Sequence, residues 1–375
     1  MRLVFFYTQY GAGSANSPWD PTQISKNRYV RELQEEGTFY MLQRMKQLRI
    51  VDDLLILIES NRGPGCFRFR DGTMLYVAPH ISKLWDFVKG DDVLFIRGGF
   101  KTWHDYLIEC KGKQWLLLYA ANTGRQKWTF WDVVFNDLQE GHSMDARGRF
   151  QFHYKKPTHP VIFHYDNGDR MYDVCIGASH IHDKKGQWLG IKTVAAYNKK
   201  YGERLNCVMP GRAFRGVHSN YINQDIHNYK LWVKRPGMVP RASVAKIMRE
   251  SKLFIHLGGG GQNDRGPLEA MRCGTPVMIR APHRHAPVVW RCPQNYIADT
   301  ENPDELASIM REALLAYSED QRRRVFEYYE ANASIENVIL PEMKRLFNAI
   351  RVNPKPDSQA VAREFLEHQE RQEGE

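Results

Sequence analysis

Short apolar runs separated by longer segments of helical periodicity make up the first half of the chain. Such runs predict buried parallel strands, because a strand covered by helices on both faces carries apolar side chains on both. Helical patterns run from about Lys26 to Arg49, over Ile81–Val88 and near Trp103–Cys110. Arg68–Met74 instead predicts a hairpin, since Asp-Gly favours a tight turn. The predicted strands are Leu3–Tyr7, Leu54–Glu59, Val93–Ile96, Trp115–Tyr119, Val133–Phe135 and Val161–His164.

The same alternation begins again after about residue 170. Its predicted strands are Tyr172–Ile176, Leu205–Met209, Leu253–Leu257 and Pro276–Ile279. Its predicted helices are Trp188–Tyr201, Ser243–Ser251, Pro267–Cys273, Asp304–Tyr317 and Asp320–Phe347. Two successive strand–helix series of similar length predict an α/β protein with two doubly wound, Rossmann-like domains that face each other across a cleft.

The turn-rich segment 155–171 marks the expected domain boundary. We expect one domain over residues 1–165, a second over 166–350, and a polar, acidic tail over 351–375 that forms a surface helix or a frayed end. A chain of 375 residues and 43.8 kDa also exceeds what one hydrophobic core usually organises.

Composition narrows the class of protein further. With 42% hydrophobic and 26% charged residues the chain is ordinary globular protein, not a disordered or fibrous one. No apolar run approaches the roughly 18 residues of a membrane span, and the stretch Leu3–Tyr7 is too short for the core of a signal peptide. The six cysteines form no close pair, so we expect reduced thiols in a soluble, cytoplasmic protein.

The net charge of +10 is unevenly distributed. Residues 1–170 contribute +4, residues 171–350 contribute +8 and residues 351–375 contribute −2. A basic excess favours a phosphorylated or polyanionic partner. Because it is concentrated in the second half, a small phosphate-bearing ligand fits it at least as well as nucleic acid does.

A glycine-rich segment in the second half carries the clearest chemistry. It reads Phe254-Ile255-His256-Leu257-Gly258-Gly259-Gly260-Gly261-Gln262-Asn263-Asp264-Arg265-Gly266-Pro267-Leu268-Glu269-Ala270-Met271 and continues as Arg272-Cys273-Gly274-Thr275-Pro276-Val277. The pattern predicts a strand, a glycine-rich loop, a short helix that begins near Pro267, a glycine that ends this helix, and a second strand. Glycines allow close approach of a ligand, and a helix N-terminus offers N–H groups to anionic oxygens. Glu269, one turn into the helix, can accept hydrogen bonds from a vicinal diol such as ribose.

The whole segment resembles the donor-binding motif of the GT-B glycosyltransferases, most closely those of the family-four type. That motif has a glycine-rich stretch, then Glu-Ala-Met, then Gly-Thr-Pro-Val, as in Leu268–Val277 here. Pro236-Gly237-Met238-Val239-Pro240 is similar to the family's nucleotide-base loop, and Glu301–Ala307 to a helix start further on. The resemblance covers about residues 170–350, while the first half is similar only in its strand–helix layout.

The resemblance implies a glycosyltransferase that uses a nucleotide sugar, with UDP as the expected nucleotide, and transfers a hexose with retention. It also implies that residues 166–350 bind this donor and residues 1–165 the acceptor. Glu269 would hold the ribose, and Lys185 and Glu269 are the expected catalytic residues. The implied donor-binding residues are Lys185, Gly237, Val239, Gly260, Gly261, Asp264, Arg265, Gly266, Pro267, Leu268 and Glu269. Gly11 and Gly13 are added on physical grounds alone, since the loop Tyr10–Ser14 after the first strand could bring backbone N–H groups to the phosphate of the donor or to the acceptor.

Two positions depart from the family pattern. Many relatives place another glutamate eight residues before the one that binds ribose, and this chain has Gly261 there. Asp264 or Gln262 could take over that contact with the sugar. The family's Gly-Arg…Lys-Gly element retains Lys185-Gly186, but its arginine is replaced near Ser179–His182, so His182 or Arg212 is left as the source of a second cation. A cation is needed because cleavage leaves negative charge on the departing diphosphate.

Candidates for the acceptor side follow the predicted strands of the first half. In doubly wound sheets ligands bind at the carboxyl ends of strands. Arg97, Asn122 and Arg125 lie at such ends, and His104 opens the next helix. A general base cannot be assigned, although Asp20, His104 and Asp105 are chemically suitable.

No metal and no cofactor besides the nucleotide-sugar co-substrate are expected. The pairs His180-x-His182 and His283-x-His285 lack a carboxylate or cysteine at zinc-site spacing, and the chain has no Asp-x-Asp motif. Side-chain cations and a helix N-terminus would then stabilise the leaving group.

Three alternatives remain open. A saccharide or other hydroxyl compound is the first expectation for the acceptor. Hydroxymethylated DNA is the second, since residues 62–70 and 147–156 interleave basic and aromatic residues that could grip phosphates and stack on an extruded base. A nucleotide-sugar-binding protein without transferase activity, or an epimerase on the same fold, is the third.

Overall fold

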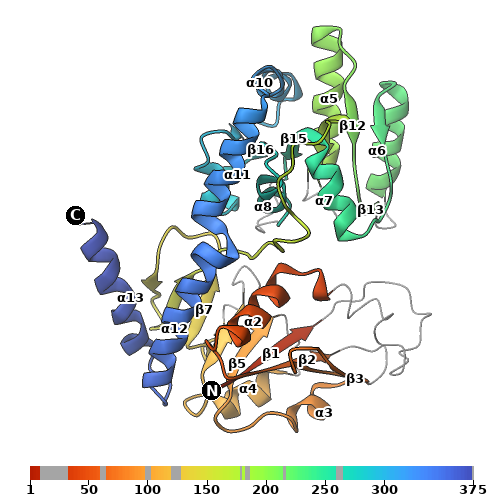
Figure 1. Cartoon of the computed structure of the whole chain (residues 1–375). Helices are drawn as coiled ribbons and strands as arrows, with labels where there is room; N and C mark the ends of the chain where they lie inside the picture. Colours follow the sequence, from red (N-terminus) through yellow and green to blue (C-terminus); the bar gives the residue numbers. More distant parts are fainter. Residues whose placement is uncertain are drawn as a thin grey trace. The chain divides into compact units, whose positions relative to one another are not determined.

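A computed structural model describes residues 1–8, 33–59, 65–97, 103–119, 128–177, 180–181, 186–213, 217–258 and 265–373 (Figure 1). The side chains of residues 8, 180–181, 212–213, 217–220 and 368–373 are outside this description. The chain divides into two compact units, Met1–Lys155 with Ile339–Glu375, and Lys156–Val338. Each unit is a largely parallel sheet with helices, which agrees with the predicted fold class.

The sheet of the first unit has nine strands in the order β3-β4-β2-β1-β5-β6-β7-β9-β8. The pairs from β4 to β9 are parallel, and the outermost pairs β3–β4 and β8–β9 are antiparallel. The central strands are buried almost throughout, which explains their continuous apolar runs. The strands are β1 (Arg2–Thr8), β2 (Asp53–Glu59), β3 (Gly65–Arg68), β4 (Met74–Ala78), β5 (Val93–Arg97), β6 (Leu116–Leu118), β7 (Val133–Asn136), β8 (Ser143–Met144) and β9 (Phe150–His153).

The last two helices of the chain belong to this first unit. Arg351 in α12 donates to the carbonyl of Ile50, and Trp115 Nε1 donates to the carbonyl of Asn353 at 3.0 Å. Phe365 in α13 packs against the rings of Phe150 and Phe152 in β9. The predicted second domain therefore ends too late, because α12 buries its apolar face in the first unit. The helices described here are α2 (Gly37–Gln47), α3 (Ile81–Trp85), α4 (His104–Cys110), α12 (Leu340–Val352) and α13 (Ser358–Glu373).

The second unit has a six-stranded, fully parallel sheet in the order β14-β12-β10-β15-β16-β17. A separate pair joins β11 (His180–Ile181) and β13 (Arg212–Ala213). The sheet strands are β10 (Tyr172–Ile176), β12 (Asn206–Val208), β14 (Trp232–Lys234), β15 (Ser251–His256), β16 (Val277–Arg280) and β17 (Tyr296–Ala298). The helices are α5 (Gln187–Tyr201), α6 (Val217–Asn228), α7 (Arg241–Arg249), α8 (Arg265–Arg272), α9 (Pro287–Trp290), α10 (Pro303–Leu315) and α11 (Glu319–Ala333), with a 3₁₀ turn at Pro282–Arg284.

Two predicted elements are wrong. Val161–His164 is not a strand: Phe163 is buried in the core of the second unit while Val161 is 70% exposed. Asp320–Phe347 is not one helix, since α11 ends at Ala333, a π-helical turn covers Ile335–Ile339, and α12 follows. The interruption coincides with the point where the chain leaves the second unit after Val338.

Candidate functional site

Two segments implied in donor binding meet at the carboxyl edge of the second sheet. Gly186 precedes α5 with a φ of 73°, and an ideal Cβ on it would lie 2.3 Å from Gly258 N and from Leu257 C. Only glycine fits a left-handed backbone this close to another backbone. The N-terminus of α5 therefore lies directly against the segment that follows β15. Lys185, Gly260, Gly261 and Asp264, together with Gln262 and His182, fall outside the described residues.

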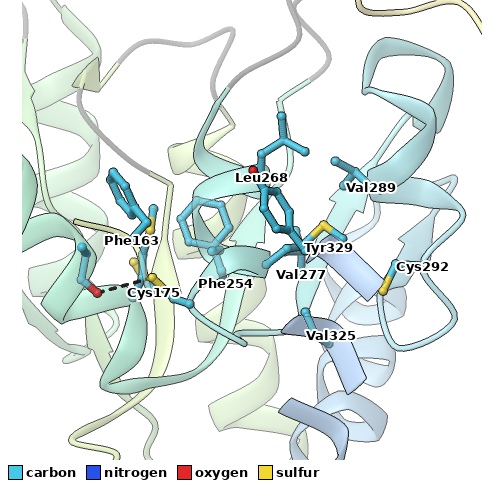
Figure 2. Packing of buried hydrophobic residues seen from close by; sticks show 14 of the residues in the cluster. Phe163, Cys175, Phe254, Leu268, Val277, Val289, Cys292, Val325 and Tyr329 are labelled. Carbon is cyan, nitrogen blue, oxygen red and sulfur yellow. Dashed lines mark hydrogen bonds between the residues drawn. The ribbon is translucent and has the colours of Figure 1, made fainter. Parts of the chain in front are cut away.

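The helix α8 opens as predicted beyond β15, and its residues are buried from Gly266 onward. Leu268 is fully buried in a cluster with Phe254, Val277 and Tyr329 (Figure 2). Its side chain thus anchors α8, and only its backbone is left for the donor contact that the sequence implied. Pro267 is buried, and Arg265 is partly exposed at the first residue of the helix.

Glu269 is a buried carboxylate with a specific partner. Its side chain is 7% exposed, and its Oε1 accepts a hydrogen bond from Nη2 of Arg241, the first residue of α7. The guanidinium carbon of Arg241 also lies 5.5 Å from the centre of the Phe163 ring. Burying a carboxylate is costly unless a cation and a hydrogen-bond donor accompany it, and Arg241 supplies both. The sequence identified Glu269 as a site residue but not Arg241.

The loop similar to the family's base-binding segment leads directly to this arginine. Gly237 has a φ of 73°, and its carbonyl accepts a hydrogen bond of 2.8 Å from Gly211 N. Val239 is partly buried against the same core cluster as Leu268, and Pro240 precedes the first residue of α7. Gly237 and Val239 thus lie four and two residues before Arg241, the partner of Glu269.

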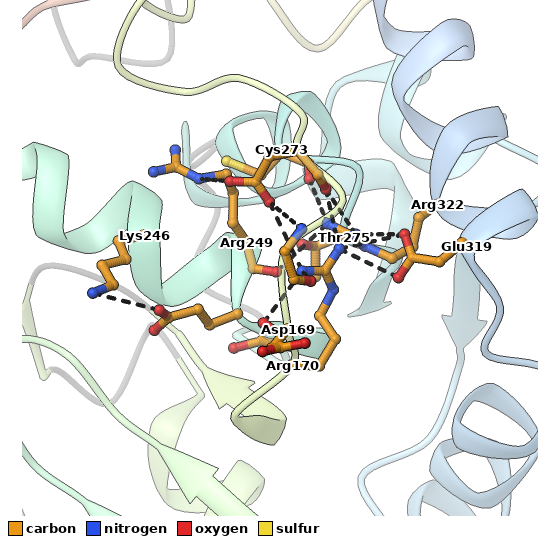
Figure 3. A network of polar contacts seen from close by, with 12 residues as sticks. Asp169, Arg170, Lys246, Arg249, Cys273, Thr275, Glu319 and Arg322 are labelled. Carbon is orange, nitrogen blue, oxygen red and sulfur yellow. Dashed lines mark hydrogen bonds and ion pairs between the residues drawn. The ribbon is translucent and has the colours of Figure 1, made fainter.

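The Cys273-Gly274-Thr275 part of the motif has a structural role. Gly274 has a φ of 73°, and a Cβ there would be 2.5 Å from the Tyr165 ring. Thr275 Oγ1 donates to the carbonyl of Met248 at 2.7 Å. The fully buried Arg322 donates to the carbonyl of Cys273 at 3.0 Å and pairs with Glu319 (Figure 3). These contacts fix the end of α8, so this part of the motif holds the helix that carries Glu269.

On the acceptor side, Arg97 lies between two tyrosine rings at the carboxyl edge of the first sheet. Its guanidinium carbon is 4.6 Å from the ring centre of Tyr7 and 5.2 Å from that of Tyr119. Its Nη1 donates to Glu36 Oε2 at 2.7 Å, immediately before α2. Tyr119 in turn shares a 2.7 Å hydrogen bond with Thr38. The sequence selected Arg97 correctly as an edge residue but could not find Glu36 or Tyr7.

Of the other acceptor-side candidates, the structure describes His104 and Asp105. His104 begins α4 with its ring edge-on to Trp128 and Phe130, and its neighbour Asp105 is 92% exposed. A buried carboxylate missed by the sequence, Glu59, ends β2 and accepts a hydrogen bond of 2.6 Å from Trp103; burial raises its pKa. Gly11, Gly13, Asp20, Asn122 and Arg125 lie outside the described residues.

Most rings of the two basic-aromatic stretches lie in the core. In the first stretch Phe69 is 4% exposed, Phe67 is partly buried with its ring edge-on to that of Phe69, and Arg68 and Arg70 are exposed. In the second stretch Phe150, Phe152 and Tyr154 are fully buried, and the cations Arg149 and Lys155 pair with Asp145 and Glu342. The described rings are therefore not placed to stack on a nucleic-acid base.

Within the described ranges, no three His, Cys, Asp or Glu side chains gather as a metal site would require. None of the helices in that part of the chain is long and apolar enough to cross a membrane.

Comparison with known proteins agrees with this architecture. Residues 169–331 match the family model described as glycosyl transferases group 1. A search of curated proteins found no significant match. Among solved structures, the sucrose-phosphate synthase of Thermosynechococcus elongatus superposes with a TM-score of 0.64 at 11% identity, over 94% of this chain and 99% of that one.

Two further structures show the same fold. HepE of Anabaena, solved with UDP, gives a TM-score of 0.62 at 12% identity over 94% of this chain and 100% of its own. The α,α-trehalose 6-phosphate synthase of Burkholderia multivorans gives 0.62 at 8% identity, over 94% and 98%.

The fold, the family match and the donor-type motif together define a glycosyltransferase with the GT-B fold. Residues 169–331, within the second unit, match the group 1 glycosyl transferase family, and this match supports transfer of a glycosyl group from a nucleotide sugar.

Proposed function

We propose that this enzyme transfers a hexose from a UDP-sugar to a hydroxyl group of a saccharide or similar compound, with retention and without a divalent metal. The observation that carries the proposal is the buried Glu269–Arg241 pair, one turn into a helix that opens from a glycine-rich loop. A carboxylate fixed there is suited to accept hydrogen bonds from the ribose hydroxyls of a nucleotide.

The departing nucleotide needs stabilisation of its negative charge during bond cleavage. We assign this to Lys185 and to the N–H groups at the starts of α5 and α8, because unpaired N–H groups and the helix dipole favour anions. His182 or Arg212 would supply a second cation. The backbone of the Gly237–Val239 loop would contact the base.

The choice of UDP is supported by HepE, which was solved with UDP and with UDP-glucose. A saccharide acceptor is favoured by the names of two neighbours, a sucrose-phosphate synthase and a trehalose 6-phosphate synthase. Retention rests on the family resemblance. For the acceptor side we propose Arg97 with its tyrosines, and His104, Asn122 and Arg125 nearby in sequence.

The test is a panel of UDP-, GDP- and ADP-sugars incubated with saccharide acceptors and with hydroxymethylated DNA. Mass spectrometry detects a new glycoside, and the proton NMR coupling of its anomeric hydrogen gives the stereochemistry. The proposal expects a UDP-sugar to support a product of retained configuration on a saccharide.

The same assay separates the alternatives. A glycosylated DNA product would replace the acceptor class, and conversion of the UDP-sugar without a new glycoside would indicate an epimerase. A binding protein would give neither. The reaction should survive EDTA; loss of activity on chelation, with recovery on adding Mg²⁺ or Mn²⁺, would refute the metal-independent mechanism.

A further inference from the structure

Arg241 occupies a position that its own helix does not favour. It is the first residue of α7, where the helix dipole and the unpaired N–H groups favour negative charge, and the first turn of α7 contains no acidic residue. Because the helix N-terminus disfavours a cation, a contact with another part of the fold is needed to stabilise an arginine there. The contacts of the side chain supply one.

The arginine side chain joins three segments that are distant in sequence. Its Nη2 donates to Glu269 Oε1 in α8, 28 residues further along the chain, and its guanidinium covers the ring of Phe163, which is fully buried. Its backbone begins α7 immediately after the Gly237–Pro240 loop. Arg241 is thus placed between the loop proposed for the base and the carboxylate proposed for the ribose.

We propose that Arg241 is a positioning residue that makes Glu269 a ribose ligand; this inference rests on the proposed function of Glu269. The arginine binds one carboxylate oxygen, Oε1, and so fixes the rotamer of the Glu269 side chain. The second oxygen, Oε2, is then oriented to accept from a ribose hydroxyl. Without the arginine, a carboxylate only 7% exposed would lose its ion-pair partner and would turn away to another rotamer.

The direct test compares the binding of UDP with that of 2′-deoxy-UDP, which differs from UDP only in lacking the 2′-hydroxyl of the ribose. Binding of both is measured by calorimetry for the wild type, Arg241→Gln, Arg241→Lys, Glu269→Gln and the double variant Arg241→Gln/Glu269→Gln. Thermal unfolding of each variant confirms that it is folded. The ratio of the two dissociation constants reports the ribose contact and is insensitive to a general loss of binding-competent protein.

We expect the wild type to prefer UDP about tenfold, as one charge-assisted hydrogen bond allows. Arg241→Gln should abolish most of this preference, weakening UDP binding about tenfold while 2′-deoxy-UDP changes little. Arg241→Lys should recover part of it, because lysine keeps the charge but not the planar geometry. The double variant should be no worse than Glu269→Gln, since the two residues act as a unit.

The matched control is Arg272→Gln. Arg272 is on α8 with Glu269, it also pairs with a glutamate, Glu330, and its guanidinium carbon lies 5.6 Å from a buried tyrosine ring. This variant should retain the UDP preference. An unchanged ratio in Arg241→Gln, or equal weakening of both nucleotides, would overturn the inference and leave the donor site intact. A wild type that binds no UDP would overturn the proposed nucleotide, and a wild type that binds both nucleotides equally would overturn the role of Glu269 itself.

Discussion

Replacing Gly186 by alanine tests whether the approach of α5 to the end of β15 is structurally required. Two separate costs add at this position. A left-handed conformation costs a residue with a Cβ roughly 1–2 kcal/mol. The new Cβ would also lie 2.3 Å from Gly258 N and Leu257 C, and both are backbone atoms that cannot rotate away. Relief requires a shift of the α5 N-terminus or of the β15 end, a distortion worth at least about 2 kcal/mol more.

The same helix provides the control. Gly202, at the C-terminal end of α5, has a φ of 70°, and no atom lies within 4 Å of its ideal Cβ. Gly202→Ala therefore carries only the conformational cost. Urea denaturation should show a loss of about 1–2 kcal/mol for Gly202→Ala and about 3–4 kcal/mol or more for Gly186→Ala.

Activity provides a second readout, since the shifted backbone lies at the proposed diphosphate site. Gly186→Ala should lower kcat/KM for the donor even under conditions where the protein remains folded, while Gly202→Ala should not. Equal destabilisation by the two substitutions would refute the close backbone approach, and full activity of Gly186→Ala would refute its part in donor binding.

Three further predictions follow from single side chains. Glu269→Ala should weaken UDP binding by about 1.5–3 kcal/mol, the value of a hydrogen bond to a charged group, and an unchanged affinity by calorimetry would contradict the assignment. Burial raises the pKa of Asp132, which accepts a 2.8 Å hydrogen bond from Leu116 N, to about 7. Because the folded-state pKa lies above the unfolded one, the carboxyl favours folding most below about pH 4 and loses this contribution as the pH rises through 7. Asp132→Asn should therefore flatten the pH dependence of the unfolding free energy between about pH 4 and 7; an unaltered profile would contradict the raised pKa of Asp132. Finally, the solvent-facing Arg68 and Arg70 should not support DNA binding, so gel shifts at three salt concentrations should not change when both become glutamine, whereas a lower salt slope would revive the DNA acceptor.

Apolar runs in the sequence predict strands best where the strand is buried on both faces. Strands β1, β2 and β5 were predicted because both of their faces are covered, so each contains an unbroken apolar run. The edge strands β14 and β17 were missed because they are largely exposed and carry no long apolar run, whereas the equally short β6 is fully buried and was predicted. The strand predicted at Val161–His164 failed for the converse reason: its apolar residues bury one ring, Phe163, without strand pairing.

In the candidate site, too, the sequence reveals residues that belong to a contiguous motif and misses those that act through distant contacts. The glycine-rich loop, the helix start and Glu269 are contiguous in sequence, so a motif can reveal them. Arg241, Glu36 and Glu59 left no sequence signal that identifies them, because each matters only through a contact with a residue 28 to 61 positions away.

The sequence by itself determined the α/β class, the two-domain organisation and the donor motif, because periodicity, turn glycines and contiguous motifs are properties of the local chain. Tertiary structure alone decided three other features. These are the packing of α12 and α13 in the first unit, the burial of most rings of the basic-aromatic stretches, and the ion pair between Arg241 and Glu269. Each depends on which distant surface is available to bury an apolar face or neutralise a buried charge, and no local pattern contains that information.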